Sequence, residues 1–410
     1  MKTATTILLT CMLAALSPAE AGAKVKPGVE VLRDDGYRQL AGKRVGLITN
    51  PTGVDTDLRS TADLLHSAPE VNLTALFAPE HGVRGDIAAG ATVAGGKDAA
   101  TGLPVHSLYG KTRKPTAAML ADIDALVYDI QDNGCRSYTF ISTLGKAMEA
   151  CIEHDKEMVV LDRPNPLGGN RVEGPVTDPD CISFVSQYRI PYIYGLTAGE
   201  LALYLNDTEF GGKARLTVVP MEGWTRTMTY ADTGMPWVLT SPHIPSAETT
   251  LLYPATGIMG ELDYISIGVG YTMPFRVACA RWIDAARLTE RLNALNLPGI
   301  RFRPLHIKPY YGFGKGEQLH GVELHITDPD KAELTLIQFY IMQELAAMYP
   351  ENAAFKTAPA GRHDMFDKVC GSRDVRRLFA RSHRVADILD IWHRDAAGFK
   401  ERSARYHLYR

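Results

Sequence analysis

Residues 71–85 read VNLTALFAPEHGVRG, and this stretch decides how the rest of the chain is interpreted. Its first half is a short apolar run of the kind that a buried strand requires. The run stops at Pro79, which cannot donate to a strand ladder, and Glu80, His81 and Arg84 follow. In open α/β sheets, ligands bind beyond the carboxyl ends of the strands. One solvated turn would explain these polar residues equally well, so the interpretation depends on whether the pattern recurs.

The pattern does recur. Apolar runs of strand length alternate with helical patterns, which predicts parallel strands joined by right-handed crossovers. The expected strands cover residues 43–50, 71–77, 101–109, 125–130, 157–161 and 216–220, and the expected helices cover residues 58–68, 117–123, 140–154 and 196–205. Four of these strands end in polar clusters, and in a parallel sheet all four ends share one edge. The clusters are Asn50; Glu80, His81 and Arg84; Asp129, Asp132 and Arg136; and Asp162, Arg163 and Asn165. We therefore predict a site along this edge.

Length and composition predict a two-domain globular protein. A chain of 410 residues exceeds one ordinary core, and its apolar content of 45% and charged content of 22% are those of soluble proteins. The net charge of -3 gives no basic field for nucleic acid, and no internal apolar stretch is long enough to span a membrane. Lys2, the apolar run 7–16 and the small residues that follow predict a signal peptide over residues 1–23. We expect an exported protein, with the periplasm as its destination, and we do not favour lipidation at Cys11.

The pattern changes after residue 246. Residues 24–246 are expected to form a Rossmann-like domain, and residues 247–410 a smaller α+β domain that completes a cleft. In the second domain, apolar residues alternate over 265–271 as in a strand with one packed face. Further strands are expected over 300–307 and 322–326, with helices over 287–295, 334–348 and most of the last forty residues. Three aromatic residues on a glycine-rich loop either stack on a sugar or pack under the loop: Tyr310, Tyr311 and Phe313.

Other site chemistries have weaker support. The glycine-rich turn after Asn50 lacks the spacing of a dinucleotide or P-loop motif. A metal bound by His81 and Asp129 has no supporting His-Glu-x-x-His or cysteine pair. Five cysteines remain after the signal segment, so at least one thiol stays free, and Cys135 is better interpreted as a tolerated thiol than as a nucleophile. Glu200 is interpreted as part of a helix capping box.

Several long motifs resemble one family. They are residues 47–53 (LITNPTG), 77–82 (FAPEHG), 129–132 (DIQD), 136–139 (RSYT) and 161–169 (LDRPNPLGG). Together they resemble the NamZ-like exo-β-N-acetylmuramidase family from about Lys43 through Asp284. The resemblance implies a Rossmann-like amino-terminal domain, a smaller carboxyl-terminal domain and a cleft between them. It also implies cleavage of non-reducing-end N-acetylmuramic acid from peptidoglycan fragments. Neither the residues nor the resemblance calls for a cofactor, and the oligomeric state stays open.

The predicted residue types suit glycoside cleavage, which commonly uses two carboxyl groups. Glu80 is the first candidate and Glu173 the second, while His81 is an alternative acid–base group that Glu80 would orient. If the substrate acetamide takes part in the reaction, one carboxylate only orients it. The remaining polar residues of the strand ends are the predicted substrate contacts. Arginines are suited to the lactyl carboxylate of muramic acid, and the amides and aspartates to its hydroxyl and acetamide groups: Arg84, Arg136 and Arg163; Asn50, Asn165, Asp129, Asp132 and Asp162.

The chain departs from the family pattern at one place. Ile267 and Val269 stand where the family often has a glutamate and an arginine. A non-catalytic or altered-specificity protein that binds cell-wall sugars is therefore the alternative. An ester or amide hydrolase would need an activated nucleophile, and the chain has no Gly-x-Ser-x-Gly elbow.

Overall fold

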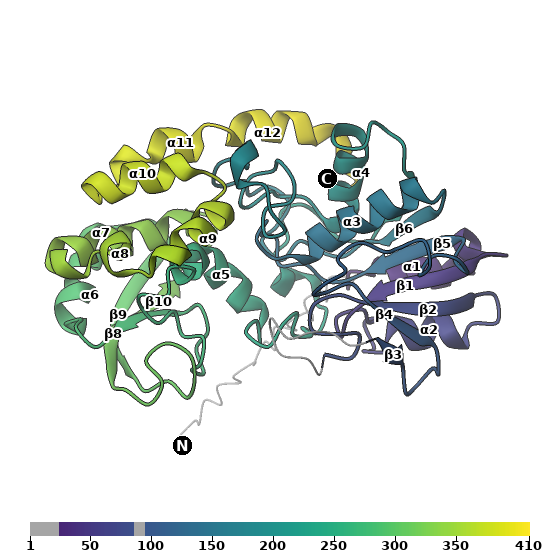
Figure 1. Cartoon of the computed structure of the whole chain (residues 1–410), viewed down its shortest axis with the longest axis horizontal. Helices are drawn as coiled ribbons and strands as arrows, with labels where there is room; N and C mark the ends of the chain where they lie inside the picture. Colours follow the sequence, from purple (N-terminus) through teal and green to yellow (C-terminus); the bar gives the residue numbers. More distant parts are fainter. Residues whose placement is uncertain (1–23, 86–94) are drawn as a thin grey trace, which may run out of the picture.

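Two sheets organise the computed structural model, which describes residues 24–85 and 95–410, and each sheet belongs to one domain (Figure 1). Within the described residues the larger sheet has seven strands in the order β3-β4-β2-β1-β5-β6-β7, all parallel except β3 against β4. The predicted α/β fold with a second, smaller domain is confirmed. The predicted signal peptide, residues 1–23, lies outside the described residues.

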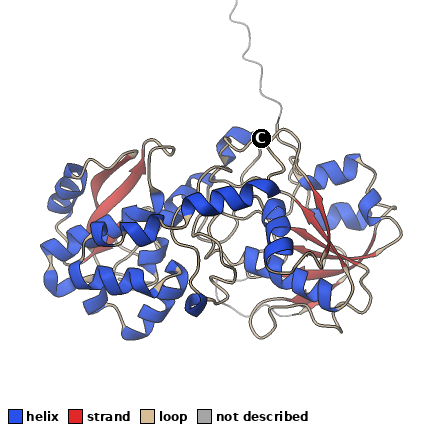
Figure 2. Cartoon of the chain, turned by 90° about the horizontal axis from the view of Figure 1, so that it is seen from above, coloured by secondary structure: helices blue, strands red, loops and turns tan. Residues whose placement is uncertain are grey.

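The first domain contains β1 (Arg44–Thr49), β2 (Asn72–Ala78), β3 (Gly96–Lys97), β4 (Pro104–Ser107), β5 (Ala125–Asp129), β6 (Glu157–Leu161), β7 (Arg215–Val219), α1 (Gly28–Asp34), α2 (Thr61–Ser67), α3 (Phe140–Glu153) and α4 (Ala198–Thr208). Its central strands, β1, β2, β5 and β6, are mostly buried on both faces because helices cover both faces (Figure 2). Val127 packs in the cluster with α1 and α2, and the next residue, Tyr128, packs in the cluster with α3 and α4. Burial on both sides explains why these strands appear as continuous apolar runs.

The carboxyl ends of the central strands β2, β1, β5 and β6 are aligned, as predicted. β1 pairs in parallel with both β2 and β5, and β5 pairs in parallel with β6. The predicted helix over 117–123 is wrong, because the structure has turns there. Its few apolar residues, Leu120 and Ile123, are buried against the sheet by these turns and do not require a helix. The capping box is confirmed: Thr197 Oγ1 accepts from the Glu200 amide, and Glu200 Oε2 accepts from the Thr197 amide.

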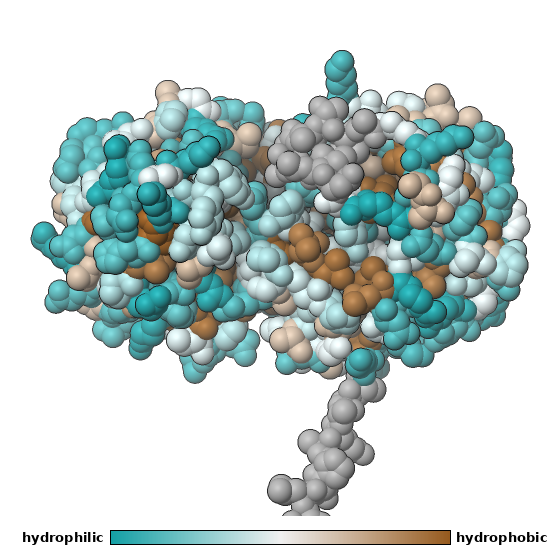
Figure 3. Space-filling view, turned by 90° about the horizontal axis from the view of Figure 1, so that it is seen from below, coloured by the Kyte–Doolittle hydropathy of each residue, from teal (hydrophilic) through white to brown (hydrophobic). Residues whose placement is uncertain are grey.

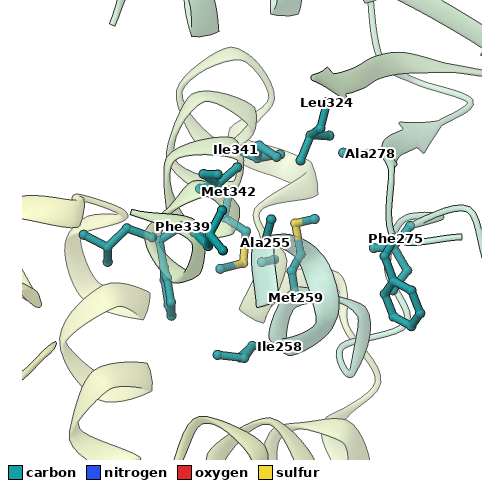
Figure 4. Packing of buried hydrophobic residues seen from close by; sticks show 14 of the residues in the cluster. Ala255, Ile258, Met259, Phe275, Ala278, Leu324, Phe339, Ile341 and Met342 are labelled. Carbon is teal, nitrogen blue, oxygen red and sulfur yellow. The ribbon is translucent and has the colours of Figure 1, made fainter. Parts of the chain in front are cut away.

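The second domain contains α5 (Ala247–Gly260), β8 (Val277–Ala280), α6 (Ala285–Ala294), β9 (Ile300–Ile307), β10 (Leu319–Ile326), α7 (Ile337–Met348), α8 (Ala354–Thr357), α9 (Ala360–Cys370), α10 (Arg373–Ser382), α11 (Leu389–His393) and α12 (Ala396–Ser403). Its antiparallel sheet has the order β8-β10-β9. Ile258 and Met259 of α5 lie in the same buried cluster as Phe339 and Met342 of α7 (Figure 4). α5 is therefore the central helix of this core.

The predicted strand over 265–271 is wrong, because the segment is a loop with a single bridge from Ser266 to Cys279. Gly268 and Gly270 have φ angles of 90° and 94°, a conformation that favours glycine. A Cβ atom on Gly270 would lie 1.9 Å from the Tyr311 carbonyl oxygen. The glycines therefore permit tight loop packing, and the apparent alternation reflects residues buried from a loop.

The carboxyl-terminal segment returns to the first domain. In Figure 1, α11 and α12 run from the second domain toward α4. Phe399 packs in one cluster with Tyr204 and Leu205 of α4. Beyond α12, the Tyr409 hydroxyl donates to Asp162 Oδ2 at 2.6 Å, and the Leu408 amide donates to Glu200 Oε1 at 2.9 Å. The chain thus crosses between the two domains twice.

The face of the molecule that Figure 3 shows is mostly hydrophilic. Figure 3 views the molecule from below and shows two lobes, with apolar surface near the place where they meet. In residues 24–85 and 95–410, no helix is long and apolar enough to cross a membrane.

Candidate active site

A cavity of about 560 Å³ lies between the two domains. Glu80 and His81, directly after β2, line it from the first domain together with Thr139, which precedes α3. The second domain contributes Glu261, which caps the end of α5, and Lys368 of α9. The strand-end segment that opened the sequence argument therefore reaches an interdomain cavity.

The Glu80 carboxylate is held by hydroxyl groups. Thr139 Oγ1 donates to Glu80 Oε2 at 3.2 Å. Burial and a hydrogen bond with Glu80 raise the pKa of Tyr109, which follows β4, to about 12. Tyr109 therefore keeps its proton at neutral pH and is available as a donor to the carboxylate. Two neutral hydroxyl groups therefore help to fix the position of Glu80.

His81 has an unusual backbone. Its φ angle is 72°, and Gly82 follows with a φ angle of 80°. A non-glycine residue in this left-handed region is strained, and such residues cluster at functional sites. The turn brings a largely buried imidazole, with 6% of its surface exposed, into the lining of the cavity beside Glu80.

Glu261 is the second carboxyl group of the cavity. Burial raises its pKa, and the positive charge of the Arg362 guanidinium opposes this effect. A raised pKa increases the fraction of Glu261 that carries a proton near neutral pH, which suits a proton donor. Tyr138 and Tyr253, which also line the cavity, form an edge-to-face pair with their ring centroids 5.7 Å apart.

A second cavity, of about 700 Å³, adjoins the first and shares Tyr109, Tyr253 and Glu261 with it. Its lining includes Ile267 and Val269, the two residues that depart from the family pattern. The departure therefore lies in the wall of a groove that is continuous with the candidate site.

The aromatic loop divides between exposure and packing. Tyr310 is 66% exposed and stacks on Tyr271, with an interplanar angle of 21°. The Tyr311 hydroxyl lies 2.7 Å from His243 Nε2, whereas Phe313 lines the second cavity. Packing under the loop is confirmed for Phe313, and stacking of a sugar on the exposed Tyr310 stays a prediction.

Glu173 is not brought together with Glu80. It lines a different cavity, of about 450 Å³, with Arg171 and Arg226. Its Oε1 accepts from Arg171 Nη1 at 2.5 Å, and its Oε2 accepts from the amide and the hydroxyl of Thr335. These bonds tie the first domain to the second, whereas the second carboxyl group in the Glu80 cavity is that of Glu261. A catalytic role for Glu173 stays a prediction.

Asp129 and Arg163 form a buried ion pair between the ends of β5 and β6. Arg163 Nε donates to Asp129 Oδ1 at 2.5 Å, and Arg163 Nη2 donates to Asp129 Oδ2 at 2.9 Å and to the Val54 carbonyl at 2.8 Å. Thr61 Oγ1 also donates to Asp129 Oδ2. Both oxygens of Asp129 are therefore occupied, which also removes it from a metal site with His81.

The Arg136 guanidinium donates hydrogen bonds from all three of its nitrogens to uncharged acceptors. Its guanidinium donates to Ser186 Oγ and to four backbone carbonyl oxygens, those of Pro175, Ile190, Val369 and Cys370, at 2.6–3.1 Å. The side chain is fully buried, and burial lowers its pKa to about 10. Because Val369 and Cys370 end α9, Arg136 fastens the second domain to the first.

The other predicted substrate contacts also have internal partners. Asp162 accepts from Thr197, Gly199 and Tyr409, and Asp132 accepts from Gly134 and Tyr194. Asn50 accepts from Thr52, and Asn165 accepts from Leu167 and donates to Leu196. Arg84 forms ion pairs with Asp63 and Asp98. Burial raises the pKa values of Asp162 and Asp132 to about 6. None of the eight predicted substrate contacts lines either half of the groove. These side chains are thus bonded within the protein and lie outside the groove, and their assignment as substrate contacts stays a prediction.

The five cysteines of the described residues are free and buried. Burial raises the pKa of the Cys135 thiol well above its usual value, which makes it a poor nucleophile. Within residues 24–85 and 95–410, no group of three or more histidine, cysteine, aspartate or glutamate residues is placed to hold a metal ion.

Several cavity residues have no signal in the sequence. Tyr109 and Arg113 lie beyond the short strand β4, and Glu261 follows a helix of the other domain. The pairing of β4 with β2 brings Tyr109 and Arg113 to Glu80, and the packing of the second domain brings Glu261 there.

Comparisons with known proteins agree with this architecture. The family model "Exo-beta-N-acetylmuramidase NamZ, N-terminal" matches residues 45–248, and "Exo-beta-N-acetylmuramidase NamZ, C-terminal" matches residues 251–409. The peptidoglycan β-N-acetylmuramidase NamZ of Bacillus subtilis (strain 168) is 44% identical over 386 residues, which cover 94% of this chain and 92% of that protein.

Two crystal structures of DUF1343 family proteins from Bacteroides fragilis NCTC 9343 are also similar. The first has a TM-score of 0.91 and 55% identity, and the match covers 94% of this chain and 99% of that chain. The second has a TM-score of 0.74 and 27% identity, and the match covers 95% and 99% of the two chains.

Proposed function

This chain belongs to the exo-β-N-acetylmuramidase NamZ family and is a glycosidase, and from this premise we propose that it releases N-acetylmuramic acid from the non-reducing ends of peptidoglycan fragments. One observation carries the proposal: the carboxyl groups of Glu80 and Glu261 and the imidazole of His81 line a single interdomain cavity. Two carboxyl groups on one cavity are the usual requirement of glycoside hydrolysis.

The chemistry divides between the two carboxyl groups. One donates a proton to the glycosidic oxygen as its bond to the anomeric carbon breaks, and the other, as a carboxylate, stabilises or attacks that carbon. Water supplies the hydroxyl group that ends on the released sugar, and its remaining proton restores the acid. Glu80 is fixed by Thr139 and Tyr109, and burial favours the protonated form of Glu261. His81 is the alternative proton carrier because it lies next to Glu80 on the same turn.

The direct test uses purified protein and the disaccharide of N-acetylmuramic acid β-linked to N-acetylglucosamine. We expect free N-acetylmuramic acid and N-acetylglucosamine in equal amounts, measured by liquid chromatography and mass spectrometry. Absence of turnover of this disaccharide and of a chromogenic β-muramide would contradict the proposal.

A second candidate is a cell-wall-sugar protein with altered specificity or no activity. Its support is that Ile267 and Val269 give the groove an apolar wall where the family often has charged residues. Sugar binding without turnover, unchanged in a Glu80→Gln variant, would favour this candidate over the hydrolase.

We also propose that residues 1–23 direct export to the periplasm and are then removed, as the charged start and apolar run of this segment indicate. The intact mass of protein recovered from the native host should correspond to a chain without this segment. Osmotic shock of the cells should release the protein. A mature chain that retains Lys2 would contradict processing, and recovery with the cytoplasmic fraction would contradict export.

A further inference from the structure

Two cationic side chains line the cavity that contains Glu80, and they differ in their partners. Lys368 forms an ion pair with Asp364, at 2.6 Å between Nζ and Oδ2. Arg113 has no carboxylate within ion-pair distance in the part of the chain that the structure describes. Its guanidinium carbon instead lies 4.3 Å from the centroid of the Phe184 ring, and Phe184 lines the same cavity. Arg113 is therefore a cation that lies against an aromatic ring and forms no ion pair with a carboxylate of the described residues.

This arrangement suits recognition of a carboxylate. A guanidinium stacked on a ring keeps the N–H groups at its edges available, since they lie in the plane of the group. Those edges match a carboxylate through two parallel hydrogen bonds. The arginines predicted to bind the lactyl carboxylate have partners within the protein. Arg136 and Arg163 are buried and hydrogen-bonded there, and Arg84 forms ion pairs with Asp63 and Asp98.

The position of Arg113 relative to the reacting groups is equally specific. Arg113 follows Tyr109, the hydrogen-bond partner of Glu80, by four residues, so one segment carries both. The cavity already holds the carboxyl groups of Glu80 and Glu261. An anionic substrate that enters it needs a cation to offset their repulsion, and Arg113 is the cavity cation without a carboxylate partner among the described residues.

We propose that Arg113, stacked on Phe184 in the wall of the Glu80 cavity, binds the lactyl carboxylate of muramic acid and so distinguishes it from N-acetylglucosamine. The two sugars differ only in the lactyl ether at O3. A side chain that binds the carboxylate of this ether therefore determines which of the two sugars is preferred. This inference rests on the proposed function, because it names the residue that would select that substrate.

The test compares 4-nitrophenyl β-glycosides of N-acetylmuramic acid, of its lactyl methyl ester and of N-acetylglucosamine. Arg113→Gln should lower kcat/KM for the muramide by about 10- to 100-fold, mainly through KM, as expected for loss of a charge-assisted hydrogen bond. Activity on the ester and on the glucosaminide should stay near that of the unsubstituted protein. Arg113→Lys should recover part of the loss, since it restores the charge without the fork.

Arg189→Gln is the matched control, because Arg189 is exposed and does not line the groove. Equal losses on the muramide and its ester in Arg113→Gln would overturn the proposal, as would a selective loss that appears in Lys368→Gln instead. If the unsubstituted protein hydrolyses no muramide, the proposed function fails, and binding of free N-acetylmuramic acid measured by calorimetry still decides the role of Arg113. Affinity that is equal in the unsubstituted protein and Arg113→Gln would overturn it.

Discussion

A Glu80→Gln variant is expected to lose about 10²–10⁴-fold in kcat on the muramyl disaccharide, with little change in KM. The substitution keeps the shape of the side chain, and the amide oxygen still accepts from Thr139. It removes the group that transfers a proton or stabilises the anomeric centre. The measurement is steady-state kinetics, together with thermal unfolding to show that the variant is folded. Full kcat in Glu80→Gln would refute the assignment.

Glu261→Gln and His81→Gln extend this measurement and assign the roles. A 4-nitrophenyl leaving group departs with little proton donation, so the variant that lacks the acid should recover activity on a 4-nitrophenyl muramide. The variant that lacks the other carboxylate should stay slow on both substrates. If only His81→Gln shows the recovery, the imidazole is the acid and Glu80 orients it.

An Arg163→Met variant is expected to lower the free energy of unfolding by about 3–5 kcal/mol, because it leaves the buried Asp129 carboxylate without its cation. The pair joins β5, β6 and the loop after β1, so the loss should destabilise the first domain. Urea unfolding followed by circular dichroism measures the effect. KM of the folded fraction should not change, since neither residue lines the groove. An unchanged unfolding midpoint with a raised KM would return Arg163 to the substrate site.

Arg44→Met is the control for this measurement. Arg44 makes a similar two-pronged contact with Asp124, from Nε at 3.0 Å and from Nη2 at 2.9 Å. Both side chains are about four-tenths exposed, and water replaces the lost partner at such sites. The unfolding midpoint should therefore change little. The comparison then shows that the loss of stability in Arg163→Met comes from the burial of its ion pair with Asp129 and not from the two-pronged geometry.

The sequence was sufficient for the central strands of the first domain, because burial on both faces leaves continuous apolar runs such as residues 125–129. It did not predict β3, which has two exposed residues. It failed at residues 117–123 and 265–271, where short apolar patterns are buried by turns and by a glycine-containing loop. Local periodicity does not distinguish residues buried by tertiary packing from residues buried by regular structure.

For the site, alignment of the strand ends was predicted correctly, but most of the polar residues at those ends lie outside the groove. Polar groups at the carboxyl ends of parallel strands are close enough to satisfy one another, as Asp129 and Arg163 do. Glu80 and His81 reach the cavity because a strained turn carries them beyond the sheet. Tyr109 and Arg113 reach the same cavity from the segment after β4, which pairs with β2, and Glu261 reaches it through the packing of the second domain. The sequence has no local pattern for either arrangement.

The return of the carboxyl-terminal segment limits how the groove can open. Because the chain passes between the lobes both before α5 and again near α12, two covalent tethers join them instead of one. Tyr409 anchors the second tether at Asp162, beside the Gly28 amide that bonds to the Asp162 carbonyl. A single tether would allow rotation about any axis, whereas two tethers resist twisting and leave a hinge whose axis passes near both crossings. Any change in the width of the groove is therefore limited by both crossings and by the Arg136 bonds that fasten α9 to the first domain.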